Sequence, residues 1–151
     1  MGLKVRDPHR LDGCVFGQEA CPVVSGTDCD RTGVVYKIEC KQCKETAENV
    51  NSVHNYIGLT RSSLHSRMQS HLAGQRRQQS HNPLFRHDRD HHQGIPQEYE
   101  TSIVATESKI VKLHCNEALR IEKQDPTYRI NERNEGGRGG LVRITASRVA
   151  Y

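Results

Sequence analysis

Two cysteines separated by two residues, Cys40 and Cys43, follow a strand-like segment and constrain the fold more than any other feature of the chain. In residues 34–39 apolar side chains alternate with polar ones, a pattern that predicts a half-buried strand. Two thiolates at this spacing can reach one tetrahedral metal ion from a single tight turn. A zinc ion there needs two more ligands, so it would tie this turn to a distant part of the chain.

Histidines later in the chain can provide those two ligands. His87 is followed by the pair His91 and His92, which is the spacing of the histidine half of a Cys2His2 zinc site. His91 lies one helical turn after His87 if a helix continues that far, so the spacing leaves both members of the pair open. We expect the ion to be structural and to join the turn after the strand to a helix.

Three more cysteines lie in the first 32 residues, an N-terminal extension without convincing periodicity: Cys14, Cys21 and Cys29. They can form a second zinc site with an imidazole borrowed from His9 or His54. Cys115 falls within a predicted helix and is expected to be a small core residue. The first residues contain no apolar stretch of a signal peptide, so we expect an intracellular protein with reduced thiols.

The composition predicts one small, polar domain. Only 34% of the 151 residues are hydrophobic, so a bound metal would add stability that the modest core lacks. A net charge of +4 fits a polyanionic partner without requiring one. No apolar run approaches the length needed to span a bilayer, so we expect no membrane partner.

Periodicity along the chain predicts an α+β fold, with a small central antiparallel three-stranded sheet flanked by helices and a Cys/His zinc-binding insertion. We expect strands over residues 34–39, 53–58 and 99–105, and helices from Thr60 or Ser62 to about Leu72, from Asn82-Pro83 to about Asp90, and over residues 107–123. Gly74 is expected to end the first helix, and residues 44–52 resemble a loop. The main domain then covers residues 33–134, and residues 135–151 form a glycine-rich tail that we expect to be flexible.

A second set of side chains has the chemistry needed to hydrolyse a phosphodiester. That reaction needs a base for the attacking water and positive charge for the phosphate and the leaving oxygen. Tyr36 and Tyr56 supply phenols. Arg67, one helical turn before His71, supplies a planar guanidinium whose N–H groups can donate hydrogen bonds to phosphate oxygens. Glu117 stands in an apolar stripe of the last predicted helix, where a carboxylate is costly unless it binds a metal or pairs with a cation such as Arg67.

In their order along the chain, these residues resemble the GIY-YIG nuclease domain over residues 33–131. The resemblance is carried by Gly33-Val34-Val35-Tyr36, Tyr56-Ile57-Gly58, Arg67-Met68-Gln69-Ser70-His71, and Glu117 followed by Pro126 and Asn131. It implies a catalytic set consisting of Tyr36, Tyr56, Arg67, His71, His81, Glu117 and Asn131. The first motif is one residue longer than Gly-Ile-Tyr, and Arg61 is an alternative for the arginine role.

The cysteine pair between the two tyrosine motifs is similar to that of the endonuclease domain of Penelope-like retroelements. This resemblance implies that the zinc ligands are Cys40, Cys43, His87 and His92, with His91 as the alternative. It also implies a DNA endonuclease that uses Mg2+ or Mn2+ at Glu117 and nicks target DNA for target-primed reverse transcription. DNA would be the partner, and the domain would belong to a larger polyprotein with a reverse transcriptase, located in the nucleus.

Two other functions remain open at the level of sequence. One is a GIY-YIG nuclease of the repair or recombination type, which cuts DNA according to its branched structure. The other is a non-catalytic, zinc-dependent module that binds nucleic acid with an affinity that falls steeply with salt.

Overall fold

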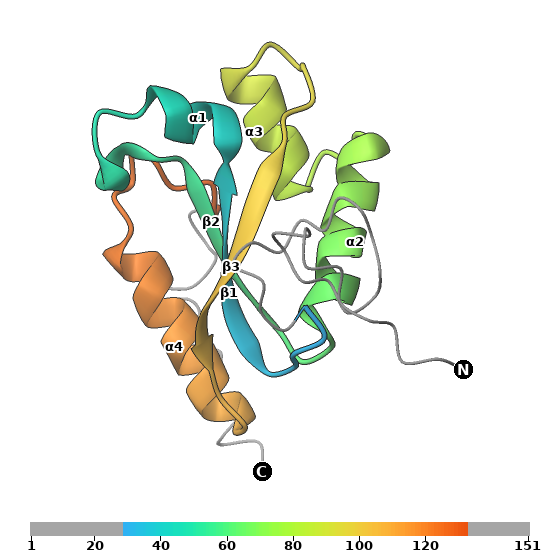
Figure 1. The fold of residues 1–151 in the computed structure, drawn as a ribbon, viewed down its shortest axis with the longest axis vertical. Helices are drawn as coiled ribbons and strands as arrows, with labels where there is room; N and C mark the ends of the chain where they lie inside the picture. Colours follow the sequence, from blue (N-terminus) through green and yellow to red (C-terminus); the bar gives the residue numbers. More distant parts are fainter. Residues whose placement is uncertain (1–28, 133–151) are drawn as a thin grey trace, which may run out of the picture.

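A computed structural model describes residues 29–132 of the chain (Figure 1). Residues 1–28 and 133–151 lie outside it, so the predicted N-terminal extension, apart from its last residues, and the predicted tail are not described. The elements are β1 (Val34–Cys40), α1 (Lys41–Thr46), a 3-10 turn (Val50–Ser52), β2 (Asn55–Thr60), α2 (Leu64–Arg76), α3 (Pro83–His91), β3 (Tyr99–Thr106) and α4 (Ile110–Lys123). The predicted α+β class, with a three-stranded antiparallel sheet and flanking helices, is confirmed.

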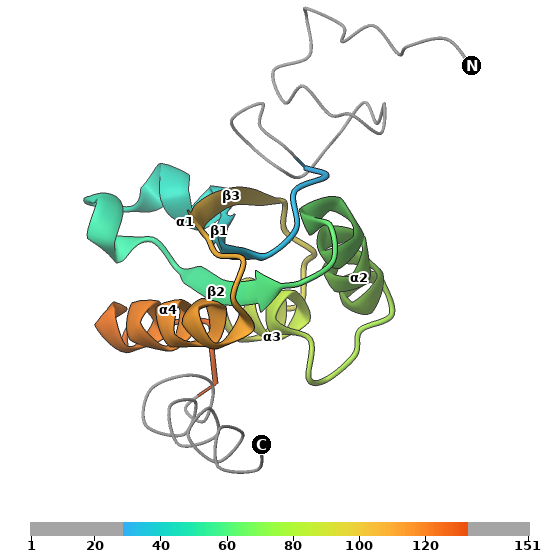
Figure 2. The same ribbon diagram turned by 90° about the horizontal axis from the view of Figure 1, so that it is seen from below.

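Strand β1 lies in the centre of the sheet, in the order β2-β1-β3, and both of its neighbours are antiparallel to it. Consecutive side chains of a strand point to opposite faces, and the packing follows this rule. Tyr36 and Ile38 pack with Leu64 and Met68 of α2, whereas Val35 packs with apolar residues of α4. Helix α4 therefore covers one face, and α2 and α3 lie on the other side (Figures 1 and 2).

Gly58 in β2 stands directly opposite Tyr36 in β1. A Cβ atom on Gly58 would lie 2.5 Å from the Tyr36 hydroxyl oxygen and 2.9 Å from a ring carbon of Tyr56, both too close for any real contact. Only glycine leaves room for the two phenol rings at this position. Packing therefore accounts for the glycine at position 58 of the second tyrosine motif, independently of any function of the tyrosines.

The outer edge of β2 is covered by a segment that follows α4. The backbone N–H of Asn55 donates to Tyr128, and the N–H of Ile130 donates back to Asn55. The side chain of Asn131 then accepts a hydrogen bond from the Ile57 N–H at 2.9 Å and donates one to the Ile57 carbonyl at 2.8 Å. Asn131 therefore takes the place of a neighbouring strand, which removes two unpaired polar groups from the edge.

Helix α2 begins and ends later than predicted. Its N-cap is Ser63, whose hydroxyl accepts from the N–H of Ser66, because the hydroxyls of Thr60 and Ser62 bond each other in the preceding turn. Gly74 does not end the helix, which continues to Arg76. A Cβ on Gly74 would lie 2.3 Å from the side-chain nitrogen of Asn82, so this glycine allows the close approach of α3 to α2.

Three other boundaries also differ from the prediction. Residues 44–52 are not simply a loop, because Lys41–Thr46 forms a short helix and Val50–Ser52 a 3-10 turn. The second strand lies two residues later than expected, at Asn55–Thr60. Helix α4 begins at Ile110 rather than at Glu107, because the Glu107 N–H donates to the carbonyl of Gly33 and extends the contact between β3 and the start of β1. The predicted cap of α3 is confirmed: the Asn82 side chain accepts from two N–H groups of the first turn.

Within residues 29–132, no helix is both long enough and apolar enough to cross a membrane.

Replacement of Gly58 by alanine tests the packing of the tyrosine pair. We expect Gly58→Ala to lower the free energy of unfolding by about 1–3 kcal/mol, because the new methyl group overlaps the Tyr36 phenol inside a packed core. Urea denaturation followed by circular dichroism measures the change. Gly94→Ala is the comparison, since its Cβ meets open space and only its positive φ is strained; a loss at Gly58 no larger than at Gly94 would contradict the packing argument.

Candidate functional site

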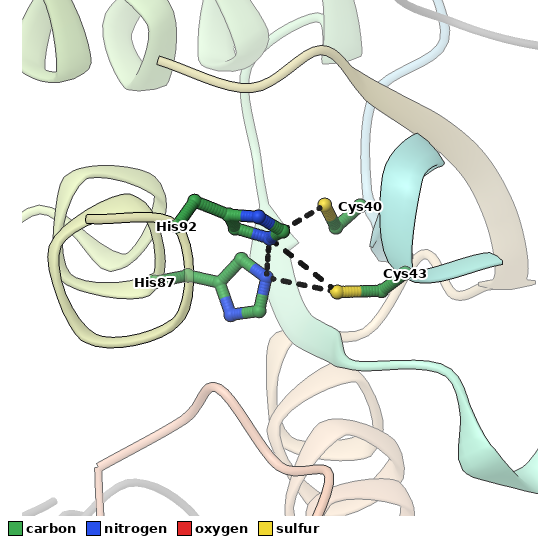
Figure 3. A group of neighbouring side chains, drawn as sticks. All are labelled: Cys40, Cys43, His87 and His92. Carbon is green, nitrogen blue, oxygen red and sulfur yellow. Dashed lines mark hydrogen bonds between the residues drawn. The ribbon is translucent and has the colours of Figure 1, made fainter. Parts of the chain in front are cut away.

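The four predicted zinc ligands come together from two separate parts of the chain. Cys40 ends β1 and Cys43 lies in the short helix α1, so one turn presents both sulfur atoms. His87 lies on α3, and His92 is the residue that caps its C-terminus. Figure 3 shows the two imidazoles facing the two sulfurs across the space between α1 and α3. This Cys2His2 cluster can hold a metal ion such as zinc.

Four of the distances between the ligand atoms match those of a tetrahedral zinc site. The Nε2 atoms of His87 and His92 are 3.2 Å apart, and the three measured S···N distances are 3.4, 3.5 and 3.5 Å. A tetrahedron with zinc–nitrogen bonds near 2.0 Å and zinc–sulfur bonds near 2.3 Å requires about 3.3 Å between nitrogens and about 3.5 Å between nitrogen and sulfur. The protein has therefore placed the ligand atoms at the separations that the ion demands.

The protonation states of this cluster determine which protons a bound cation must displace. Burial raises the pKa of the Cys43 thiol to about 12, and the neighbouring Cys40 adds to this effect. Burial lowers the pKa of His87 to about 3, helped by the nearby imidazoles of His54, His91 and His92, so His87 is in the neutral form that binds metals. A zinc ion displaces thiol protons outright, so it converts a costly pair of buried thiolates into a neutral complex.

A buried carboxylate next to His87 fixes helix α3 in place. Asp88 accepts hydrogen bonds from the Tyr99 hydroxyl at 2.6 Å, from the Gln75 side chain at 2.8 Å and from the Gln97 N–H at 3.2 Å. These donors belong to β3, to α2 and to the segment before β3, so Asp88 joins three parts of the fold beside the metal ligands. Sequence reasoning missed Asp88, because it stands in a polar run of charged residues and histidines with no signal that marks it as buried.

A second cluster brings together Tyr36, Arg67 and His71. The Nε of Arg67 donates to the Tyr36 hydroxyl oxygen at 3.1 Å, and the same hydroxyl lies 2.8 Å from Nε2 of His71. Burial, and then the charge of Arg67, lower the pKa of His71 to about 4, so its imidazole is neutral at pH 7. In the tautomer that leaves Nε2 unprotonated, His71 accepts a hydrogen bond from the Tyr36 hydroxyl, which gives an ordered chain of hydrogen bonds from Arg67 through Tyr36 to His71.

Tyr56 completes this cluster from the neighbouring strand. Its ring lies 6.4 Å from that of Tyr36 and 5.5 Å from that of His71. Although burial lowers the pKa of Arg67, the oxygens of Tyr36 and Tyr56 raise it, with a net increase. Tyr36 is fully buried and Tyr56 nearly so, whereas Arg67 is exposed, so the guanidinium is the group of this cluster that solvent can reach.

Glu117 lies half-buried on α4, and so belongs to the other layer of the fold. It stands one turn from Leu113 and one turn from Ile121, which pack with Val35 and Ile57. Its position on the apolar stripe of the helix agrees with the periodicity in the sequence. In the described part of the chain it belongs to no group of three or more residues that could hold a metal ion.

The contacts of the other predicted site residues are with other parts of the fold. His81 is exposed in the turn before α3. Arg61 is exposed and lines a pocket with Gly33 and Glu107. Asn131 has both atoms of its amide engaged by the backbone of Ile57, which accounts for its burial.

The second predicted zinc site is only partly described. Cys14 and Cys21 lie outside the described residues, as does His9, and that site stays a prediction. Cys29 is buried in the core cluster with Tyr36. His54 lies instead beside His87 and His91, and Cys115 is half-buried on α4.

No protein-family model, curated protein or solved structure matches this chain.

Removal of one sulfur tests the Cys2His2 site. We expect Cys43→Ser to retain one zinc ion fewer per chain than the native protein after gel filtration, because three ligands hold zinc far more weakly than four. Elemental analysis measures the zinc, and thermal unfolding should show a lower Tm for the variant. Cys115→Ser is the matched control, since its thiol lies on α4; equal zinc contents in the two variants would count against the site.

Acidification tests the environment of His71. The unfolded chain binds a proton at a pKa near 6.5 and the folded protein only near 4, so stability is fully present above pH 6.5 and is lost as the pH falls toward 4. At about pH 5 the free energy of unfolding should be about 2 kcal/mol lower than at about pH 8 because of this group. Urea denaturation should show that His71→Gln, compared with the exposed His114→Gln, removes this part of the pH dependence. A pH dependence unchanged in His71→Gln would show that the group titrates normally.

Proposed function

We propose that this chain is a metal-dependent DNA endonuclease domain of the GIY-YIG type. The observation that carries the proposal is the hydrogen-bonded group of Arg67, Tyr36 and His71, with Tyr56 against it. These four residues come from two strands and one helix. They are the two tyrosines of the tyrosine motifs and the arginine and histidine of the Arg-x-x-x-His pattern. A chance likeness in sequence would not be expected to bring all four side chains into one cluster.

The chemistry of this cluster suits a phosphodiester. Arg67 is exposed and permanently charged, so its guanidinium can bind the oxygens of the scissile phosphate while its Nε stays on Tyr36. The positive charge of Arg67 lies beside the Tyr36 oxygen, and Nε2 of His71 shares a hydrogen bond with the same hydroxyl. Tyr56, which is slightly exposed, would hold or deprotonate the attacking water, whereas the buried Tyr36 and His71 would position Arg67 on the phosphate.

Glu117 is the residue that we assign to the catalytic metal. Mg2+ in nucleases is bound by one or two carboxylates together with substrate phosphates, so a single half-buried carboxylate fits this need without a preformed cluster. When bound, Mg2+ or Mn2+ would stabilise the charge on the phosphate and the leaving oxygen. Because α4 lies on the opposite side of the sheet from the Tyr36 cluster, the role of Glu117 in this proposal rests on the resemblance in sequence.

In the same proposal, the zinc site has a structural role and not a catalytic one. It ties the end of β1 to α3, and Asn82 at the start of α3 donates a hydrogen bond to the backbone carbonyl of His71. Zinc would thereby stabilise the packing of α3 against α2, the helix that carries Arg67 and His71. The cysteine pair between the tyrosine motifs also supports a retroelement endonuclease over a repair or recombination nuclease. In that proposal the domain nicks target DNA for reverse transcription as part of a polyprotein with a reverse transcriptase, in the nucleus.

One observation favours a second function, a zinc-dependent module that binds nucleic acid without cutting it. Tyr36 is fully buried and packs into the core above Gly58, which is also what a purely structural tyrosine would do. In such a module Arg67 would contact the phosphate backbone but no hydrolysis would follow. The two functions differ in one measurable property, the nicking of DNA.

Supercoiled plasmid incubated with the zinc-loaded protein and Mg2+ or Mn2+ tests the proposal. We expect nicked circles, no reaction when the added metal is omitted, and a loss of about 100-fold or more in rate for Arg67→Ala and for Glu117→Gln. Omission of the metal is preferable to EDTA, because EDTA also removes zinc. Arg76→Ala is the matched control, since this arginine is exposed at the end of the same helix as Arg67 and should leave the rate nearly unchanged.

Each other outcome has a defined meaning. DNA binding that weakens steeply with salt, with no nicking, would replace the nuclease by the binding module. Nicking that survives Glu117→Gln would show that the metal lies elsewhere. A strong loss in Arg61→Ala but not in Arg67→Ala would move the phosphate contact to the arginine after β2. Preference for branched DNA over plasmid would favour the repair or recombination type.

A further inference from the structure

Two histidines that the Cys2His2 site does not use lie directly beside it. His54 comes from the segment just before β2, and His91 is the last residue of α3. Their rings are 4.4 Å apart between centroids, and each lies 4.9 Å from the ring of His87. One ring nitrogen from each of three histidines lies within 4.8 Å of the other two: His54, His87 and His91.

His87 is already engaged by the first ion. Its Nε2 faces Cys43 at 3.4 Å and His92 at 3.2 Å, so only its Nδ1 remains, and Figure 3 shows this nitrogen turned away from the two sulfurs. When Nε2 of an imidazole binds a metal, Nδ1 carries the proton and cannot bind a second ion until that proton is lost. His54 and His91 carry no such restriction.

We propose that His54 and His91 hold a second transition-metal ion, separate from the ion in the Cys2His2 site, with water completing its coordination. Imidazole ligands select zinc, copper or nickel and disfavour Mg2+ and Ca2+, so the class of ion is defined by the chemistry of the pair. Because two thiolates neutralise the charge of the first zinc, the neighbouring complex does not repel a second cation.

The fold holds the two imidazoles in place for this role. Tyr128 packs edge-on against the ring of His54, with centroids 5.4 Å apart, and the carbonyl of His54 accepts a hydrogen bond from the N–H of Cys40. The first site therefore fixes the backbone of His54, and α3 carries His87 and His91 one turn apart. His91 is exposed and His54 partly so, which leaves room for water ligands and makes the second ion weaker and more exchangeable than the first.

Equilibrium dialysis of the whole protein against zinc alone, from nanomolar to high micromolar concentrations, tests this second site. We expect the native protein to bind a weak zinc ion in addition to its tightly bound zinc, and His54→Gln and His91→Gln each to bind one weak ion fewer per chain than the native protein. Glutamine keeps the size and polarity of the side chain but is a poor zinc ligand. His114→Gln, an exposed histidine on α4, is the matched control and should keep both ions.

The outcomes separate the two sites from each other. A native protein that never exceeds one zinc would overturn the proposal, and so would a zinc content of His91→Gln equal to that of the native protein at every zinc concentration. Cys43→Ser should lose the tight ion and not the weak one in the same measurement. Circular dichroism checks the fold of each variant, and because His91 is exposed, His91→Gln decides the question even if His54→Gln is unstable.

Discussion

The two-residue alternation of strand β1 determines where each candidate site lies. β1 is the central strand, and its apolar side chains are buried on both faces, each of which packs against a different layer. Tyr36 points to the layer of α2 and α3, where Arg67 and His71 meet it, and Val35 points to the layer of α4. A shift of the register by one residue would exchange the two faces and dismantle the Tyr36 cluster.

The Cys2His2 cluster and the Tyr36 cluster share the same supporting elements. Cys40 ends the strand that carries Tyr36, and α3 carries His87 while its cap residue Asn82 bonds to the backbone of His71. Asp88 fixes α3 through donors on the elements around it, so the position of the imidazoles does not depend on the ion alone. This explains how a chain with a modest apolar content can still hold two groups of polar side chains in defined positions.

Local patterns predicted the elements well and their ends less well. The strands and the three longer helices all appear, and the cap at Asn82 is confirmed, because periodicity and capping act over a few residues. Gly74 was assigned to a helix end because glycine commonly lies there, but in this fold it makes room for Asn82. Such a close approach depends on the packing of a later helix, and a local pattern carries no information about it.

The sequence by itself determined the spacing of the cysteine pair, the α+β class, and the residue types at Tyr36, Arg67 and His71, since each follows from order and period along the chain. The tertiary structure decided which histidine completes the Cys2His2 cluster: His92 follows the last turn of α3, where the chain leaves the helix and turns its ring toward the sulfurs. It also placed Asn131 on the edge of β2 and Asp88 in a buried network. These are contacts between residues far apart in sequence, and they depend on how finished elements pack, which no short-range pattern encodes.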